Sequence, residues 1–138
     1  MQKIRVLVAE DFAPFRHFVC STLSQRSDLQ IVAEVSDGQE AVQKTKELKP
    51  DLMLLDVGLP SLNGIAAARQ IRKFIPHAKI IFVTQESSAE VAEEAFNSGG
   101  RGFVVKTRAG TDLLAAVDAV LEGRQFISCG VPFVPGGL

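Results

Sequence analysis

Short runs of apolar residues alternate along the chain with longer segments in which apolar residues recur every three or four positions. The short runs are rich in Val, Ile and Leu and have the length of buried strands, whereas the longer segments have the period of amphipathic helices. The predicted strands are residues 4–9, 29–35, 52–55, 79–83 and 102–105. A helical segment follows each strand, and these segments begin near residues 13, 38, 64, 88 and 111.

Individual residues mark the ends of several predicted helices. Pro14 suits a first helical turn, because an N–H at that position would have no partner within the helix. Asp37 is a candidate N-cap, and Pro50 ends the helix that Asp37 begins. The strict alternation of strand and helix predicts an α/β fold, namely a doubly wound, five-stranded parallel sheet with the flavodoxin-like strand order 2-1-3-4-5.

The chain is predicted to hold one folded domain followed by a tail. Its 138 residues suit a single domain, and all five strand–helix units fall within residues 1–122. Residues 123–138 contain prolines and glycines and have no helical period. We expect them to form a tail, or a linker to a further domain.

Composition bears on the partners and the compartment of the protein. The net charge is −1, so no overall field attracts nucleic acid or an anionic membrane. The two cysteines form no CxxC pattern, which fits a reducing compartment. No apolar stretch approaches the roughly 20 residues of a membrane span, and no signal peptide precedes the first strand. A soluble cytoplasmic protein is therefore expected.

Polar side chains stand where the predicted strands end. Glu10 and Asp11 follow the first strand, Asp56 the third, Thr84 the fourth and Lys106 the fifth. In the predicted strand order the first and third strands are neighbours, roughly 4.8 Å apart, so their acids crowd together. Two like charges about 4 Å apart repel by ~4 kcal/mol, and carboxylate oxygens suit Mg²⁺ as the compensating cation. Any one of these acids alone is as readily a solvated strand end, but five groups on one edge favour a site.

This ordered set resembles the receiver domains of two-component response regulators, the CheY-like superfamily. The similarity runs from residue 3 to about residue 128. Four segments carry it: residues 7–11, 51–56, 59–64 and 102–106. Residues 123–128, which follow the last predicted helix, are most similar to the NarL/FixJ (LuxR-type) branch.

The resemblance implies a role for each residue at the predicted edge. Asp56 would accept a phosphoryl group from the phosphohistidine of a sensor histidine kinase. Asp11, Asp56 and the backbone carbonyl of Gly58 would bind Mg²⁺, and Glu10 would do so directly or through water. Lys106 would neutralise charge on the phosphoryl oxygens, and Thr84 would donate its hydroxyl to one of them. Only self-directed phosphotransfer and autodephosphorylation are implied, not turnover as an enzyme.

The resemblance also implies how the phosphoryl group is read out. Phe103 stands where the family keeps a switching aromatic, and it would move as Thr84 is drawn inward; simple core packing is the alternative for this residue. The face made by the fourth helix, the fifth strand and the fifth helix would change shape and serve for homodimerisation. A DNA-binding domain beyond residue 138 is implied by the LuxR-type resemblance, although a stand-alone receiver would look the same.

Four positions depart from the common family pattern or vary within it. Gln85 stands where a very small residue is usual, and together with Gly58 and Glu86 it would tune the lifetime of the phosphoryl group. Thr107 replaces a proline that often carries a cis bond. Because a cis bond to a residue other than proline costs ~3–4 kcal/mol, the peptide before Thr107 is expected to be trans.

Three alternatives compete with a phosphorylated receiver. A haloacid-dehalogenase-type phosphatase also uses a strand-end aspartate, but it needs a second aspartate where this chain has Gly58. A flavodoxin needs a glycine- or hydroxyl-rich phosphate cradle, and the first loop here is acidic. A degenerate receiver would act as an interaction module without phosphorylation, and Gln85 and Thr107 are the residues that keep this alternative open.

Overall fold

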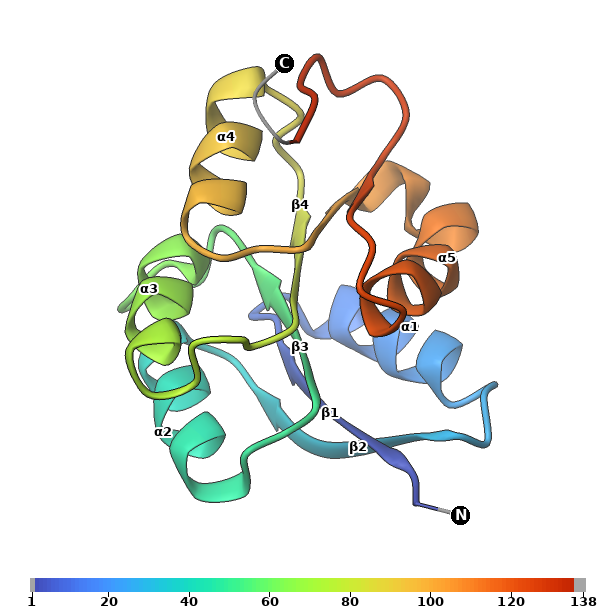
Figure 1. The fold of residues 1–138 in the computed structure, drawn as a ribbon. Coiled ribbons are helices and arrows are strands. Elements are labelled where there is room, and N and C mark those ends of the chain that lie inside the picture. Colours follow the sequence, from blue (N-terminus) through green and yellow to red (C-terminus); the bar gives the residue numbers. More distant parts are fainter. Residues whose placement is uncertain (1, 136–138) are drawn as a thin grey trace.

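The structure is a computed structural model that describes residues 2–135, and a parallel β-sheet forms its centre (Figure 1). The sheet has six strands in the order β2-β1-β3-β4-β5-β6, and all of its pairings are parallel. The strands are β1 (Ile4–Ala9), β2 (Leu29–Val35), β3 (Leu52–Asp56), β4 (Ile80–Thr84), β5 (Gly102–Val105) and β6 (Phe126–Ile127). The predicted doubly wound α/β fold is confirmed, but its five strands are corrected to six.

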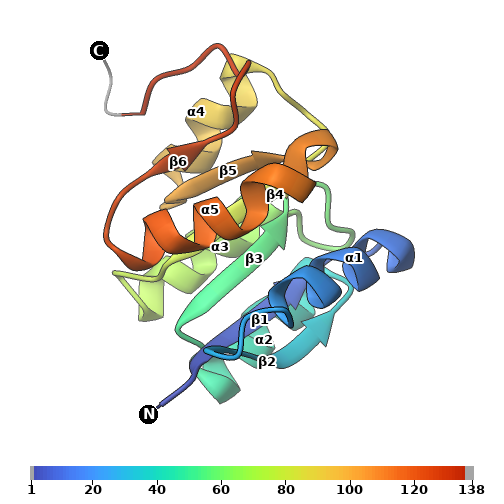
Figure 2. The same cartoon turned by 90° about the vertical axis from the view of Figure 1, so that its right-hand side faces the viewer.

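Helices cover both faces of the sheet (Figures 1 and 2). One face carries α1 (Ala13–Leu23) and α5 (Ala109–Leu121); the other carries α2 (Gly38–Leu48), α3 (Gly64–Phe74) and α4 (Ala89–Asn97). A single 3₁₀ turn, Lys106–Arg108, leads from β5 into α5. Among the described residues, no helix combines the length and the apolar character that a membrane crossing requires.

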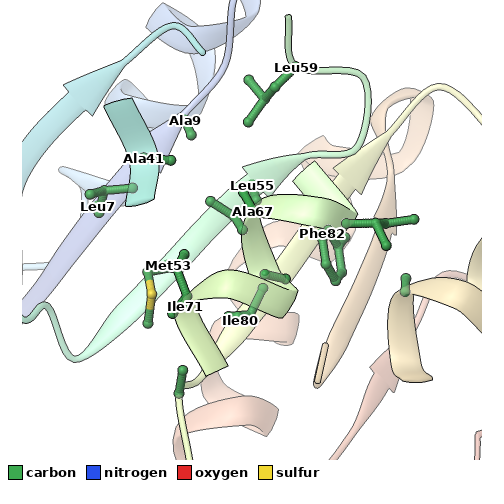
Figure 3. Close-up of a cluster of buried hydrophobic side chains, with 14 of the residues drawn as sticks. Leu7, Ala9, Ala41, Met53, Leu55, Leu59, Ala67, Ile71, Ile80 and Phe82 are labelled. Carbon is green, nitrogen blue, oxygen red and sulfur yellow. The ribbon is translucent and has the colours of Figure 1, made fainter. Parts of the chain in front are cut away.

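Each face of the sheet has its own hydrophobic core, because side chains alternate along every strand. Leu7, Leu55 and Phe82 lie in the core beneath α2, α3 and α4, and Figure 3 shows this cluster together with Ile71 of α3. The neighbouring strand residues point to the opposite core, beneath α1 and α5. Burying one such side chain stabilises the fold by about 1.5–3 kcal/mol, so the central strands are held from both sides.

Side-chain caps determine where three helices begin. Asp37 accepts a hydrogen bond from the backbone N–H of Glu40, as predicted for the start of α2. Asn63 caps α3 and Ser88 caps α4 in the same way, each through the N–H three residues on. These caps anchor the helices next to the carboxyl ends of the strands, where the predicted site lies.

The sixth strand lies in the segment that was expected to be a tail. The N–H of Phe126 donates to the carbonyl of Arg101 at 3.0 Å, and the N–H of Ser128 donates to the carbonyl of Phe103 at 2.9 Å. A strand of two residues is too short to leave a periodic signal in the sequence, which is why the pattern did not reveal it. The division at residue 122 into a receiver domain and a tail stays a prediction.

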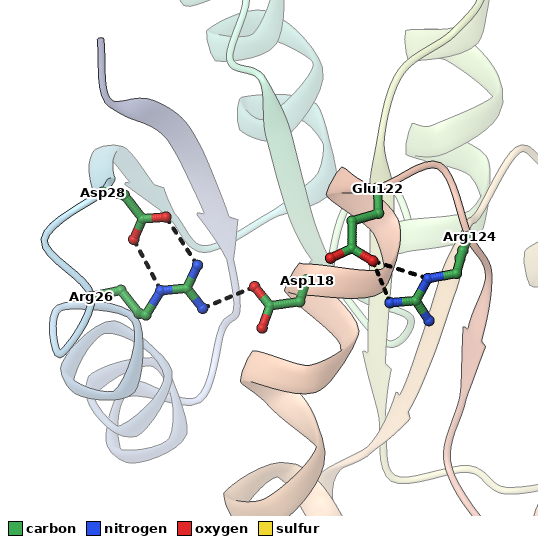
Figure 4. Close-up of polar contacts among 5 residues, drawn as sticks. All are labelled: Arg26, Asp28, Asp118, Glu122 and Arg124. Atoms are coloured by element: carbon green, nitrogen blue, oxygen red, sulfur yellow. Dashed lines mark hydrogen bonds and ion pairs between the residues drawn. The ribbon is translucent and has the colours of Figure 1, made fainter. Parts of the chain in front are cut away.

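An ion-pair cluster joins the loop after α1 to α5, near the C-terminal end of the fold (Figure 4). The guanidinium of Arg26, just after α1, makes two hydrogen bonds to Asp28 at 2.9 and 3.0 Å and a third to Asp118 of α5 at 2.9 Å. These bonds raise the pKa of Arg26 and lower that of Asp28. The cluster therefore links α1, the loop before β2 and α5 on one side of the molecule.

Candidate functional site

Three carboxylates meet at the carboxyl edge of the sheet. Glu10 and Asp11 follow β1, and Asp56 ends β3; because β1 and β3 pair in register, Ala9 lies beside Leu55 and the acids lie side by side. Each of the three residues offers a carboxylate oxygen, and these oxygens lie within 4.8 Å of one another. Glu10 and Asp56 are buried, whereas Asp11 is exposed. The sequence predicted this cluster, and the structure assembles it.

Lys106 reaches into the carboxylate cluster from the 3₁₀ turn that directly follows β5. Its Nζ atom lies 2.8 Å from Oε1 of Glu10 and 3.3 Å from Oδ2 of Asp56, and only 12% of its side chain is exposed. The ammonium also lies 4.8 Å from the centre of the Phe15 ring on α1. The sequence predicted Lys106 close to Asp56, but the contacts with Glu10 and Phe15 were missed. The peptide between Lys106 and Thr107 is trans, as predicted.

The buried ion pairs shift the pKa values of Glu10 and Lys106. Burial raises the pKa of Glu10, and the ion pair with Lys106 and the hydrogen bond from the Phe12 N–H only partly oppose this effect. For Lys106, burial acts to lower the pKa, but the ion pair with Glu10 and the charge of Asp56 outweigh it and raise the pKa. Lys106 therefore carries its positive charge at neutral pH and offsets part of the acidic charge around it.

The loop after β3 holds Asp56 in position. The N–H of Gly58 donates to Oδ1 of Asp56 at 3.1 Å, which fixes the direction of the carboxylate. Gly64, at the start of α3, packs directly against the backbone of Asp56, and a Cβ atom at position 64 would lie 2.1 Å from the Asp56 carbonyl oxygen. The sequence indicated Gly64 as a helix start and as part of the family-like segment 59–64, but its close approach to Asp56 was missed.

Thr84 and the loop after β4 form the other side of the site. Thr84 is buried, and its hydroxyl oxygen accepts a hydrogen bond from the N–H of Glu86 at 2.9 Å. An open cavity of about 360 Å³ lies over the carboxylates. It is lined by Asp11, Phe12, Asp56, Gly58, Thr84, Gln85, Glu86 and Lys106. Of these lining residues, the exposed Phe12 is the one that sequence reasoning did not single out.

Comparison with known proteins identifies the family. A model of the response regulator receiver domain matches residues 6–118 of the chain. The chain belongs to this family. It is the receiver domain of a two-component response regulator, and regulators of this class are phosphorylated by sensor histidine kinases.

The curated relatives of this receiver include response regulators of staphylococci. The response regulator protein VraR from Staphylococcus aureus is 33% identical over 122 residues, which cover 88% of this chain and 58% of VraR. The chain thus spans a little over half the length of the curated relatives it matches.

Two solved structures extend the comparison. A LuxR-family response regulator from Aurantimonas sp. SI85-9A1 superposes with a TM-score of 0.90 at 30% identity, over 94% of this chain and 93% of that one. The receiver domain of NarL from Mycobacterium tuberculosis superposes with a TM-score of 0.84 at 28% identity, over 90% and 100% of the two chains.

Phe103 of the receiver lies inside the core beneath α4. Its side chain is fully buried, and it shares a face of the sheet with Phe82, its neighbour on β4. Because side chains alternate along β4, Thr84 points to this same face. The two residues that the resemblance assigned to the switch are therefore on one side of the sheet, next to α4.

The site geometry bears on the alternatives to a phosphorylated receiver. Membership of the receiver family leaves no support for a phosphatase of the haloacid-dehalogenase type or for a flavodoxin. A degenerate receiver is not favoured either, because the three acids, Thr84 and Lys106 are all retained at one edge.

Proposed function

We propose that the chain is a switch that accepts a phosphoryl group on Asp56 from a sensor histidine kinase, in a reaction that depends on Mg²⁺. The observation that carries this proposal is the position of Lys106, whose ammonium lies between the carboxylates of Glu10 and Asp56. A charged lysine held against a strand-end aspartate is suited to neutralise charge that develops on a transferring phosphoryl group.

The donor set of the site fits Mg²⁺. Three carboxylate oxygens within 4.8 Å of one another form a hard, anionic ligand set, which Mg²⁺ prefers over softer sites. We assign Asp11, Asp56 and the backbone carbonyl of Gly58 as ligands. Glu10 would act directly or through water, because one of its oxygens is already paired with Lys106. When bound, the ion would supply positive charge to the phosphoryl oxygens.

Asp56 is the nucleophile in this proposal. A carboxylate oxygen of Asp56 attacks the phosphorus, and the bond between phosphorus and the histidine nitrogen of the kinase breaks. Lys106 stabilises the charge on the phosphoryl oxygens. The hydroxyl oxygen of Thr84 accepts a hydrogen bond from Glu86, so its own proton is free to be donated to a phosphoryl oxygen. Gly58, Gln85 and Glu86 border the same cavity and would set how fast water removes the group.

The output follows from the charge of the phosphoryl group, about −2. We propose that it draws Thr84 toward Asp56 and that Phe103, on the same face of the sheet, repacks. The face formed by α4, β5 and α5 would then change shape and become available for homodimerisation. One solved relative is described as a DNA-binding response regulator of the LuxR family, from S. aureus, and transcription regulation through a DNA-binding domain is proposed here by analogy. Cytoplasmic localisation stays a prediction.

Phosphoryl-analogue binding tests this function. Wild-type protein with Mg²⁺ should bind beryllofluoride and should be labelled by acetyl phosphate, whereas Asp56→Asn should do neither, because the amide is a poor nucleophile. Lys106→Ala should keep part of the binding but lose the response at the α4–β5–α5 face. Labelling of Asp56→Asn at the wild-type rate would refute the assignment. A wild-type protein that binds no beryllofluoride would instead be a degenerate receiver.

A further inference from the structure

The segment 126–133, which we name the C-terminal strap, lies along the edge of the sheet beside β5 and then beside α4 (Figures 1 and 2). It begins with β6, which pairs with Gly102 and Phe103 of β5. It therefore occupies the surface through which the receiver was expected to pair with a second copy.

Ser128 fastens the strap to β5 and α5. This residue is 1% exposed, and its hydroxyl accepts a hydrogen bond from the Val105 N–H at 3.0 Å while donating one to Asp112 of α5 at 2.8 Å. Asp112 is held in turn by Arg108 at 3.2 Å. Both hydrogen-bonding roles of the serine are satisfied, and Val105 directly precedes Lys106 of the site.

Aromatic rings connect the strap to the predicted switch residue. Phe133 stacks on Phe96 of α4, with ring centroids 5.8 Å apart and planes at 24°. Phe96 in turn lies 6.4 Å from Phe103. Ile127 and Val131 of the strap pack against the same core cluster. The ring that Phe133 covers, Phe96, is thus the neighbour of Phe103, the ring that the proposed switch moves.

We infer that the C-terminal strap is an intramolecular ligand of the α4–β5–α5 face and that phosphorylation of Asp56 releases it. The inference rests on the proposed function. The docked strap accompanies an arrangement in which the Thr84 hydroxyl accepts a hydrogen bond from the Glu86 N–H and Phe103 packs beside Phe96. A close-packed interior does not accommodate movement of one ring without displacing its neighbours. Drawing Thr84 toward Asp56 and repacking Phe103 therefore removes the support for Phe133.

Release of the strap also controls which partner the face can bind. The backbone groups of β5 that pair with β6 and the ring of Phe96 cannot contact a second copy while the strap covers them. Homodimerisation through this face therefore requires the strap to leave first. A chain that continues beyond residue 138 would carry this change into whatever follows.

Hydrogen exchange on the full chain tests the release. In the docked state the Phe126 amide donates to the carbonyl of Arg101, just before β5, and the Ser128 amide donates to that of Phe103 in β5. We expect Mg²⁺ with beryllofluoride to accelerate the exchange of both amides at least about tenfold. The amide of Leu54 in the central strand should be unchanged, and Asp56→Asn should show no effect at any amide. Beryllofluoride binding is followed separately by ¹⁹F NMR. Binding without faster exchange of the strap would overturn this inference alone, whereas absence of binding would remove the proposed function as well.

A matched pair of variants tests the coupling from the other side. Phe133→Ala removes the stack on Phe96, while Val134→Ala changes the next residue, which is 63% exposed. If docking opposes phosphorylation, Phe133→Ala should bind beryllofluoride about three- to tenfold more tightly, given the usual strength of an aromatic pair. Val134→Ala should stay within about twofold of wild type. Ser128→Ala, which removes two hydrogen bonds, should also tighten binding. Equal or weaker binding by both Phe133→Ala and Ser128→Ala would refute the coupling.

Discussion

At the scale of single residues, three contacts fix the position of the Lys106 ammonium in the site. Two carboxylates and an aromatic ring contact this ammonium, and they come from the loop after β1, from β3 and from α1. Phe15 is the least expected of these partners, because it lies on a helix rather than at a strand end. A cation held over a ring gains roughly 0.5–2 kcal/mol, depending on how far it is removed from water. We therefore expect Phe15 to position Lys106 for phosphoryl transfer.

Replacing Phe15 should slow phosphorylation without unfolding the protein. Phe15→Leu keeps an apolar side chain but removes the ring, so labelling of Asp56 by acetyl phosphate should slow about three- to tenfold. Phe18→Leu is the control, because Phe18 lies on the same helix with its ring 5.8 Å away and is 42% exposed. Labelling rates and chemical unfolding are measured on both variants. Equal rates for the two would show that the ring of Phe15 does not position Lys106.

The two cysteines should differ sharply in reactivity. Burial, reinforced by the nearby charge of Glu34, raises the pKa of Cys20 to about 12, so at pH 8 only roughly one molecule in ten thousand carries the thiolate there. Cys129 is exposed in the C-terminal strap. Iodoacetamide at pH 8 should therefore alkylate Cys129 once per chain and reach Cys20 only in urea, as measured by peptide mass spectrometry. Alkylation of Cys20 in the folded protein would contradict this expectation.

At the scale of elements, the start of α3 determines where Asp56 lies. Gly64 brings the helix so close that no side chain fits between it and the Asp56 carbonyl. The N–H of Gly64 also donates to the carbonyl of Val57 at 2.9 Å, which closes the loop between β3 and α3. The position of Asp56, the proposed phosphoacceptor, therefore depends on a helix that contributes no proposed ligand to the site.

A methyl group at position 64 should disturb the site through the backbone. Gly64→Ala should lower the free energy of unfolding by about 1–3 kcal/mol, as overpacking usually does, and should weaken beryllofluoride binding. Gly110→Ala on α5 is the control, because its Cβ would meet no atom closer than 4.0 Å. It should stabilise the protein by about 0.5–1 kcal/mol. Urea unfolding measures the stability of both variants. A Gly64→Ala protein as stable as Gly110→Ala would show that the loop between β3 and α3 relaxes freely.

The pattern of the sequence predicts most elements and the content of the site, but not its closest contacts. Strand periodicity and the polar strand ends sufficed to bring Glu10, Asp56 and Lys106 to one edge. The pairing of Glu10 with Lys106 was missed because the sequence does not show which carboxylate a long side chain reaches. The role of Gly64 was missed because a glycine at a helix start has several explanations. The strand β6 was missed because two residues have no period.

At the scale of the whole molecule, the Arg26 cluster joins parts of the chain that are far apart in sequence. Its two carboxylate partners are Asp28, before β2, and Asp118, on α5, and it lies on the side of the sheet opposite α4. Surface ion pairs are usually weak, but a guanidinium shared by two carboxylates has more favourable geometry than an isolated pair. We expect this cluster to contribute measurably to global stability.

Removing the Arg26 cluster should lower the global stability of the protein. Arg26→Ala should lower the free energy of unfolding by about 1 kcal/mol. Arg124→Ala removes a more exposed pair that joins only Glu122, two residues away, and should cost less than about 0.5 kcal/mol. Urea unfolding of the two variants at low and at high salt measures the difference. If both variants lose the same stability, the link across the molecule contributes nothing beyond a local pair.

The short strand β6 has a consequence for how the protein behaves in concentrated solution. Without it, β5 would present a row of unpaired backbone groups along a flat border, a ready template for the border of another molecule. With it, the outermost strand is only two residues long. It is soon followed by Gly130, whose positive φ breaks an extended backbone, and by Pro132, which has no N–H to donate to a ladder. Undocking of these residues would expose β5 as an edge strand able to pair with another molecule, so activation and a tendency to aggregate should rise together.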